Sequence, residues 1–176
     1  MNWQNFEEEC LKYLKVKYGD FFTLFGKSNS NVSDICFDNR INKFYIEVKM
    51  PHSQCAQFVL LPDIATKRFR YSDKNKSKPN KASDAIVDYM NLNYEEFLGV
   101  EIILDKQVFY DWVINFYREK NVKYIITKSK DGFLIVPIEK FGHYFDVFAI
   151  YREKRSGSSE FCNAHKDDFT YAMNQA

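Results

Sequence analysis

Two short apolar runs joined by a polar turn constrain the fold of this chain more than any other feature. The first run, at residues 32–37, carries Asp34. The second run, at residues 44–50, alternates apolar and polar residues with the two-residue period of a β-strand. Glu47 and Lys49 therefore point to the same face. If the two runs pair as a hairpin, Asp34 lies beside them, and a sheet carries two carboxylates and an ammonium group close together.

The expected pair of carboxylates points to a metal-dependent reaction. Two carboxylates at close range repel each other unless a cation lies between them. Their oxygens suit Mg²⁺, which keeps several waters and takes phosphate oxygens as further ligands. A neighbouring lysine can hold the attacking water or offset charge on the reacting phosphate. Asp34, Glu47 and Lys49 therefore predict metal-assisted hydrolysis of a phosphodiester, and the alternative is a strand with a solvated charged face.

Asp34 followed by Glu47-Val48-Lys49 resembles the signature of the PD-(D/E)XK nuclease superfamily, most of all its type II restriction endonucleases and archaeal-type Holliday junction resolvases. The resemblance covers roughly the first third of the chain. Ser33 stands where the superfamily's name has proline. The resemblance implies a four-stranded mixed sheet flanked by helices, cleavage of DNA and dependence on a divalent metal.

The resemblance also implies roles for individual residues. Asp34 and Glu47 would bind the metal with the Val48 carbonyl as a third ligand, and Lys49 would position the water. Mg²⁺ is the expected cofactor, and Mn²⁺ is expected to substitute for it. In the resolvase branch a glutamate of the first helix joins the metal site, and Glu7 matches it by position. The alternative for Glu7 is an acidic first turn that complements the helix dipole.

Polar segments on either side of the motif are candidates for DNA contacts. The turn at residues 26–31 contains Ser28 and Ser30, whose hydroxyl groups can bind phosphate oxygens. A short helix is expected after the second strand, with Gln54 and Gln57 on one face. Glutamine can orient the nucleophilic water or contact a base edge. The alternatives are an ordinary loop and a solvated helix surface.

The stretch at residues 67–81, called the basic segment below, has seven basic residues and one acidic residue. Its Pro, Asn and Ser content predicts a loop. Lys74, Lys76 and Lys78 are expected to make sequence-independent contacts with phosphates. The alternative is a solvated surface loop.

The remaining periodicity predicts helices over 5–18, 83–90 and 105–120, and strands over 21–25, 100–104, 124–128, 133–138 and 146–152. The strand at 100–104 is a candidate continuation of the central sheet. The apolar stripe of the helix at 105–120 is assigned to the core or to a dimer interface. Lys154, Arg155 and Ser156 follow the last strand and suit DNA, with cations for phosphate or guanine and a small residue for close approach. The alternative is a polar exit from the strand.

Length and composition favour one folded domain. The chain has 176 residues, of which 45% are hydrophobic and 18% aromatic. We expect a single nuclease domain over 1–176, with a catalytic core at 1–66, the basic segment, and sheet completion, dimerisation and DNA recognition at 82–176. The net charge is +1, so DNA contacts must come from local clusters. The four cysteines show no spacing typical of a disulfide framework or a zinc site.

These features together predict an α/β fold with a mixed central β-sheet flanked by helices, and a Mg²⁺-dependent type II restriction endonuclease that cuts double-stranded DNA at a specific site. A homodimer is expected because a palindromic site matches a two-fold protein, and a cognate DNA methyltransferase is the expected functional partner. No membrane-spanning run or signal-peptide core occurs, which predicts the prokaryotic cytoplasm. A junction resolvase-like nuclease and a non-catalytic DNA-binding module remain the alternatives.

Overall fold

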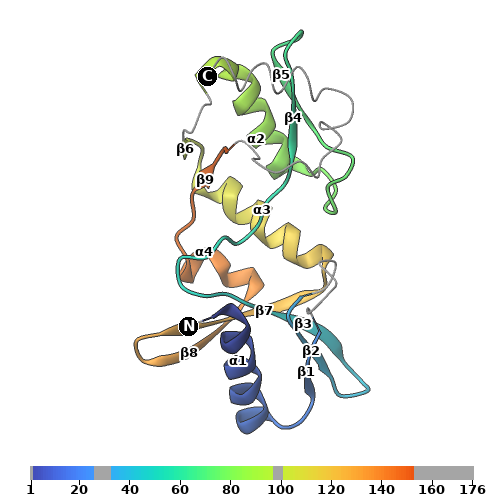
Figure 1. Cartoon of the computed structure of the whole chain (residues 1–176), viewed down its shortest axis with the longest axis vertical. Coiled ribbons are helices and arrows are strands. Elements are labelled where there is room, and N and C mark those ends of the chain that lie inside the picture. Colours follow the sequence, from blue (N-terminus) through green and yellow to red (C-terminus); the bar gives the residue numbers. More distant parts are fainter. Residues whose placement is uncertain (1, 26–32, 97–100, 153–176) are drawn as a thin grey trace. The chain divides into compact units, whose positions relative to one another are not determined.

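The computed structural model describes residues 2–25, 33–96 and 101–152 (Figure 1). The chain forms two compact units. Met1–Gln57 and Lys106–Val147 belong to the first unit, and Phe58–Asp105 and Phe148–Ala176 belong to the second. The sequence of the second unit therefore interrupts that of the first. The expectation of a single nuclease domain stays a prediction.

The first unit contains a mixed five-stranded sheet in the order β1-β2-β3-β7-β8. Its strands are β1 (Phe22–Leu24), β2 (Ile35–Asp38), β3 (Lys43–Val48), β7 (Val122–Ser129) and β8 (Gly132–Pro137). β3 and β7 run parallel, whereas the other neighbours run antiparallel. The sheet is mixed, as expected, but it has five strands where the resemblance implied four.

The register of β2 and β3 decides which side chains face which layer. The two strands pair antiparallel with Ile35 opposite Ile46, which confirms the predicted hairpin. Ile35, Ile46 and Val48 belong to the core under the first helix. Because successive side chains of a strand alternate between faces, Glu47 points to the opposite face of the sheet.

Helices cover both faces of the sheet. α1 (Trp3–Tyr18) is capped by the side chain of Asn2 and packs its buried face on one side of the sheet. α3 (Lys106–Glu119) packs on the other side, together with the short elements η2 (Ile138–Lys140) and α4 (Phe141–Tyr144). In the described part of the chain, no helix is long and apolar enough to cross a membrane.

The described residues of the second unit form two small antiparallel strand pairs, one α-helix and one short 3-10 helix. β4 (Leu60–Asp63) pairs antiparallel with β5 (Arg68–Tyr71), and β6 (Glu101–Ile102) pairs antiparallel with β9 (Ala149–Ile150). The other elements are α2 (Lys81–Leu92) and η1 (Tyr94–Glu96).

Two sequence expectations for the second unit are wrong. The strand expected near residue 101 does not continue the central sheet, because β6 pairs only with β9 among the described strands. The basic segment is not a loop throughout, because its first part is β5. There, Phe69 is buried between the exposed Arg68 and Arg70, which is the alternation of a strand with one solvated face.

Candidate active site

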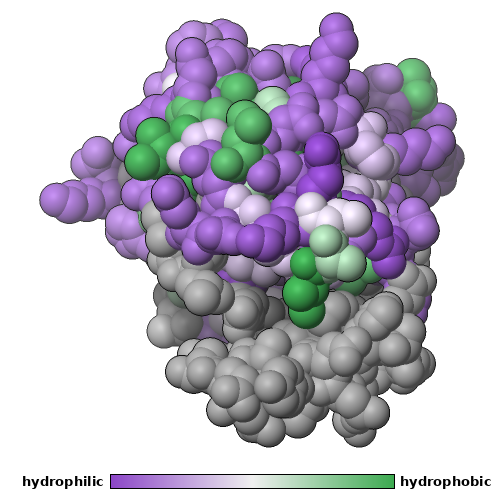
Figure 2. Space-filling view, turned by 90° about the horizontal axis from the view of Figure 1, so that it is seen from above, coloured by the Kyte–Doolittle hydropathy of each residue, from purple (hydrophilic) through white to green (hydrophobic). Residues whose placement is uncertain are grey.

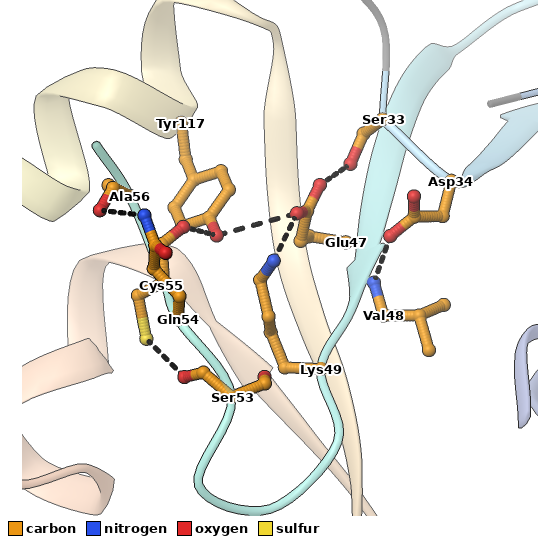
Figure 3. Close-up of polar contacts among 10 residues, drawn as sticks. All are labelled: Ser33, Asp34, Glu47, Val48, Lys49, Ser53, Gln54, Cys55, Ala56 and Tyr117. Carbon is orange, nitrogen blue, oxygen red and sulfur yellow. Dashed lines mark hydrogen bonds and ion pairs between the residues drawn. The ribbon is translucent and has the colours of Figure 1, made fainter. Parts of the chain in front are cut away.

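The hairpin places the three motif residues together at the end of β3 (Figure 3). The Val48 N–H donates to Asp34 Oδ2 at 2.8 Å, so the aspartate lies against the strand that carries the glutamate. Lys49 Nζ lies 2.8 Å from Glu47 Oε1. The Lys49 N–H donates to the Ile126 carbonyl of β7 at 2.9 Å, which anchors the backbone at the lysine. The predicted proximity is confirmed, whereas the chemical roles of these residues stay predictions.

Glu47 is buried, with only 9% of its surface exposed, and its carboxylate contacts three polar side chains. Ser33, which is 1% exposed, donates its hydroxyl hydrogen to Glu47 Oε2. Tyr117 of α3 donates to Glu47 Oε1 at 3.4 Å, the same oxygen that faces Lys49. Proline, which the superfamily's name has at the position of Ser33, lacks a hydroxyl group. The departure from the signature therefore supplies a hydrogen bond to the second carboxylate.

The surroundings of Asp34 disfavour its charged form. Burial raises the pKa of Asp34 from 3.8 to about 7, and the charges of Glu47 and Glu7 act in the same direction. The Val48 N–H and the charge of Lys49 oppose this rise without cancelling it. A cation between the carboxylates would reverse the balance, because it favours the ionised form of each.

The oxygen donors at the end of β3 fit a hard divalent cation that keeps part of its water shell. Asp34 and Glu47 offer carboxylate oxygens and Val48 a backbone carbonyl, and Mg²⁺ prefers such ligands together with water. Across the described residues, no group of three or more His, Cys, Asp or Glu side chains gathers as a metal site. An ion at this position therefore depends on backbone, water or substrate oxygens besides the carboxylate pair.

A pocket of about 250 Å³ lies beside Glu47 and Lys49. Its walls come from the loop after β3 and from the C-terminal end of α3, and they include Gln54, Cys55, Ala56, Gln57, Phe116 and Lys120. The ammonium group of Lys120 lies 4.2 Å from the centroid of the Phe116 ring. The pocket thus joins the motif to amide groups and a second cation, a combination suited to phosphate oxygens or base edges.

The loop of residues 51–57 is not the helix that the sequence predicted. Its backbone makes a turn after β3 and then continues without regular secondary structure. The hydroxyl group of Tyr117 donates to the Cys55 carbonyl, so the loop is held from α3 rather than by its own helical bonds. Gln54 Nε2 still donates to Gln57 Oε1 at 2.9 Å, so the two amides meet without a helix.

Comparison with known proteins identifies the family of this chain. No protein-family model and no curated protein matches the sequence. Among solved structures, an HhaI endonuclease in complex with DNA is similar, with 44% sequence identity and a TM-score of 0.84 over 98% of this chain and 69% of that chain. This chain belongs to the type II restriction endonucleases of the PD-(D/E)XK type. The expected α/β fold with a mixed central sheet flanked by helices is confirmed.

In this restriction endonuclease, side-chain hydrogen bonds hold the loop that follows β5 in the basic segment. Asn75 accepts a hydrogen bond from the Val59 N–H at 2.7 Å and donates one to the Val59 carbonyl at 2.8 Å, as a strand partner would. The Tyr71 hydroxyl lies 2.8 Å from Ser77 Oγ. The exposed side chains between and beside these hydrogen-bonded residues include those of Lys74, Lys76 and Lys78, together with Asp73 and Pro79. Polar side chains likewise cover most of the described surface in Figure 2.

Five of the DNA contacts expected for the restriction endonuclease lie outside the described residues, namely Ser28, Ser30, Lys154, Arg155 and Ser156. Glu7 lies on α1, and its charge contributes to the raised pKa of Asp34. The auxiliary metal role of Glu7 stays a prediction.

Sequence reasoning did not single out Tyr117, Phe116 or Lys120 in this restriction endonuclease. The two aromatic residues were assigned to the apolar stripe of a helix, and the stripe does pack on the sheet. The available signal was chemical, because a tyrosine inside a core needs a partner for its hydroxyl group. The packing of α3 against β3 decides which acceptor the hydroxyl group reaches. The periodicity of a helix contains no information about that packing.

Proposed function

We infer that this protein is a site-specific endonuclease that hydrolyses phosphodiester bonds of double-stranded DNA. The similarity to an HhaI endonuclease in complex with DNA carries this inference. The gathering of Asp34, Glu47 and Lys49 at the end of β3 supports it. An intact set of three argues against a non-catalytic DNA-binding module.

A divalent metal ion is part of the proposal, with Mg²⁺ as the ion and Mn²⁺ as its substitute. Asp34, Glu47 and the Val48 carbonyl would hold it. When bound, such an ion offsets charge on the reacting phosphate and lowers the pKa of a water. Lys49 positions the attacking water and adds positive charge near the phosphate. Glu7 would serve as an auxiliary metal ligand beside Asp34.

DNA contacts are proposed on both units. In the pocket, Gln54 and Gln57 orient the water or contact a base edge. On the basic segment, Lys74, Lys76 and Lys78 bind phosphates regardless of sequence. For Ser28, Ser30, Lys154, Arg155 and Ser156 the support is the sequence pattern alone.

A homodimer and a cognate DNA methyltransferase complete the proposal. A palindromic site presents the same contacts twice, which a two-fold protein matches. Sedimentation on DNA tests the oligomeric state, and a plasmid time course tests the cutting mode. A dimer that cuts both strands in one binding event gives linear product directly. Accumulation of nicked circles by a protein that sediments as a monomer would overturn the dimer. In vitro methylation of the site should block cutting.

The decisive experiment is digestion of a mixed panel of plasmid and phage DNA with Mg²⁺. Discrete bands support a restriction endonuclease. Cleavage of branched substrates alone would favour the junction resolvase-like nuclease, and no cleavage would favour the binding module. Ca²⁺ is expected to support binding without cutting, because its looser coordination misplaces the nucleophile. Undiminished cleavage in excess EDTA would remove the metal from the mechanism.

A further inference from the structure

A buried tyrosine reaches the active site from a helix far away in the sequence. Tyr117 lies on α3, and none of its surface is exposed. Its hydroxyl group points toward β3, where it donates to Glu47 Oε1 at 3.4 Å (Figure 3). The same hydroxyl group donates to the carbonyl oxygen of Cys55, which is the closer of the two acceptors. One side chain thus contacts both the catalytic strand and the pocket loop.

The chemistry of this contact is asymmetric. A phenol has one hydrogen to donate, whereas a carboxylate and a carbonyl can only accept. Glu47 and Cys55 therefore share a single donor. The pKa of Tyr117 lies well above its ordinary value, because of burial first and then because of the charge of Glu47. The hydroxyl group therefore keeps its hydrogen at neutral pH.

Two other side chains donate to Glu47 besides Tyr117. Ser33 donates to Oε2, and Lys49 contacts Oε1 at 2.8 Å. Ser33 and Lys49 thus supply one donor to each oxygen, and Tyr117 adds a second donor to Oε1, which favours one orientation of the carboxylate. The same hydroxyl group also donates to the carbonyl of Cys55, which lies in the loop that carries the pocket glutamines.

We propose that Tyr117 is a positioning residue that aligns the Glu47 carboxylate with the pocket loop of residues 51–57. Its hydroxyl group fixes the distance between the motif and the loop that bears Gln54 and Gln57. Metal-ligating carboxylates are commonly oriented by such outer hydrogen bonds, and removal of one typically costs 10–100-fold in metal affinity or activity. This inference rests on the proposed function, since it assigns Tyr117 to the alignment of the nuclease site.

A purely structural role makes a different prediction. Tyr117→Phe keeps the ring that packs between α3 and the sheet and removes only the hydroxyl group. If the ring alone matters, this variant changes neither metal affinity nor the chemical step. If the hydroxyl group aligns Glu47, both change while the fold stays intact. Tyr110→Phe is the matched control, because Tyr110 lies on the same helix and packs its ring against Phe141.

The test compares the two variants with the wild type in the absence and presence of DNA. Calorimetric titration with Mn²⁺ alone should show roughly tenfold weaker binding for Tyr117→Phe, and cleavage should show kcat lowered about 10–100-fold. KM for DNA should stay within about threefold, because the missing interaction acts on the chemical step. Tyr110→Phe should match the wild type in each measurement.

A second measurement does not depend on how well Tyr117→Phe folds. In otherwise unmodified protein, 3-fluorotyrosine at position 117 should show a change in its ¹⁹F resonance on addition of Mg²⁺, and the same label at position 110 should not. An unchanged resonance at 117, or metal affinity and kcat equal to those of Tyr110→Phe, would overturn the inference. Asp34→Ala separates the two levels of the argument. If the wild type cuts no DNA in the mixed panel, the proposed function fails, and if Asp34→Ala still cuts at the wild-type rate, the assignment of the active site fails. If Asp34→Ala is inactive while Tyr117→Phe is fully active, only the role of Tyr117 fails.

Discussion

The two units use charged side chains in opposite ways. In the first unit, Asp34, Glu47 and Lys49 are withdrawn from solvent and interact with one another over short distances. In the second unit, the lysines of the basic segment are exposed, and neutral side chains such as Asn75 hold the backbone beneath them. Charges in a low-dielectric interior interact strongly and depend on position, whereas exposed charges are screened and act nearly independently. The contrast separates groups suited to chemistry from groups suited to attracting a polyanion.

The largest effect is expected from single changes in the first unit. Asp34→Ala removes a proposed metal ligand, and Lys49→Ala removes the cation beside the water. Each should lower cleavage below about 1% of the wild-type rate, as is typical when a group that stabilises developing charge is removed. A cleavage assay and a gel shift on the same purified variants measure this. Binding should persist in Lys49→Ala, and near-normal cutting by that variant would remove Lys49 from the proposed active site.

The second unit should respond gradually instead. Replacing Lys74, Lys76 and Lys78 by Ala should weaken binding to cognate and random duplexes alike. The slope of the logarithm of affinity against the logarithm of salt concentration should fall by about 1 for each lysine that binds a phosphate. Fluorescence anisotropy at several salt concentrations gives this slope. An effect confined to the cognate duplex would make the basic segment a reader of bases.

A matched triple variant in the first unit tests whether location matters beyond charge. Lys12, Lys123 and Lys130 are exposed there, and their replacement by Ala changes the net charge by the same amount. A smaller decrease in affinity than in the basic-segment variant is expected. Equal decreases would mean that overall charge, rather than the second unit, governs attraction to DNA.

Two equally buried serines sharpen the comparison at a third level. Ser33 and Ser83 are each 1% exposed, but Ser33 donates to Glu47 whereas Ser83 closes the capping box of α2. Ser33→Ala should lower kcat about tenfold with little change in thermal midpoint. Ser83→Ala should lower stability by about 1 kcal/mol and leave kcat unchanged. The reverse pattern would contradict the assignment of Ser33 to the site.

The titration of Asp34 is expected to have the smallest effect on cleavage, because a bound cation keeps this carboxylate ionised. Its effect is therefore measured on the stability of the metal-free protein. In the folded metal-free protein the pKa of Asp34 is raised from 3.8 to about 7, so the folded state holds this proton more tightly than the unfolded state. The stabilising contribution is fully present below pH 3.8 and is lost as pH rises through about 7. Urea unfolding in EDTA should therefore show stability falling across that interval. Asp34→Asn should flatten the fall, and an unchanged slope would contradict the burial of this carboxyl.

The sequence predicted the elements whose pattern is local. Alternation in β3 gave the strand, and the polar turn gave the hairpin that brings Asp34 to Glu47. The helix expected at Gln54 failed because glutamines spaced three apart are a surface pattern with no apolar period behind it. β5 was missed because its basic residues suggested a loop, although Phe69 between Arg68 and Arg70 already alternates.

Contacts between distant segments escaped the sequence for a physical reason. Glu47 and Tyr117 meet only because the parallel pairing of β3 with β7 brings α3 over that face of the sheet. Nothing in either segment alone specifies the partner. The hydrogen bond from Ser33 to Glu47 was not predicted either. The sequence shows that Ser33 replaces a proline, but it does not show which group the hydroxyl group reaches.

The parallel pairing of β3 with β7 also sets the moment at which the protein acquires its site during synthesis. A ribosome completes β3 at Val48, yet it must add the whole of Phe58–Asp105 before it reaches α3 and β7. At about 5–20 residues per second, a nascent chain carries the full motif for some seconds without α3 and β7. A fragment released in that interval would hold every residue of the signature and none of the second layer that covers Glu47. Premature termination therefore yields a chain with the motif but without a finished nuclease.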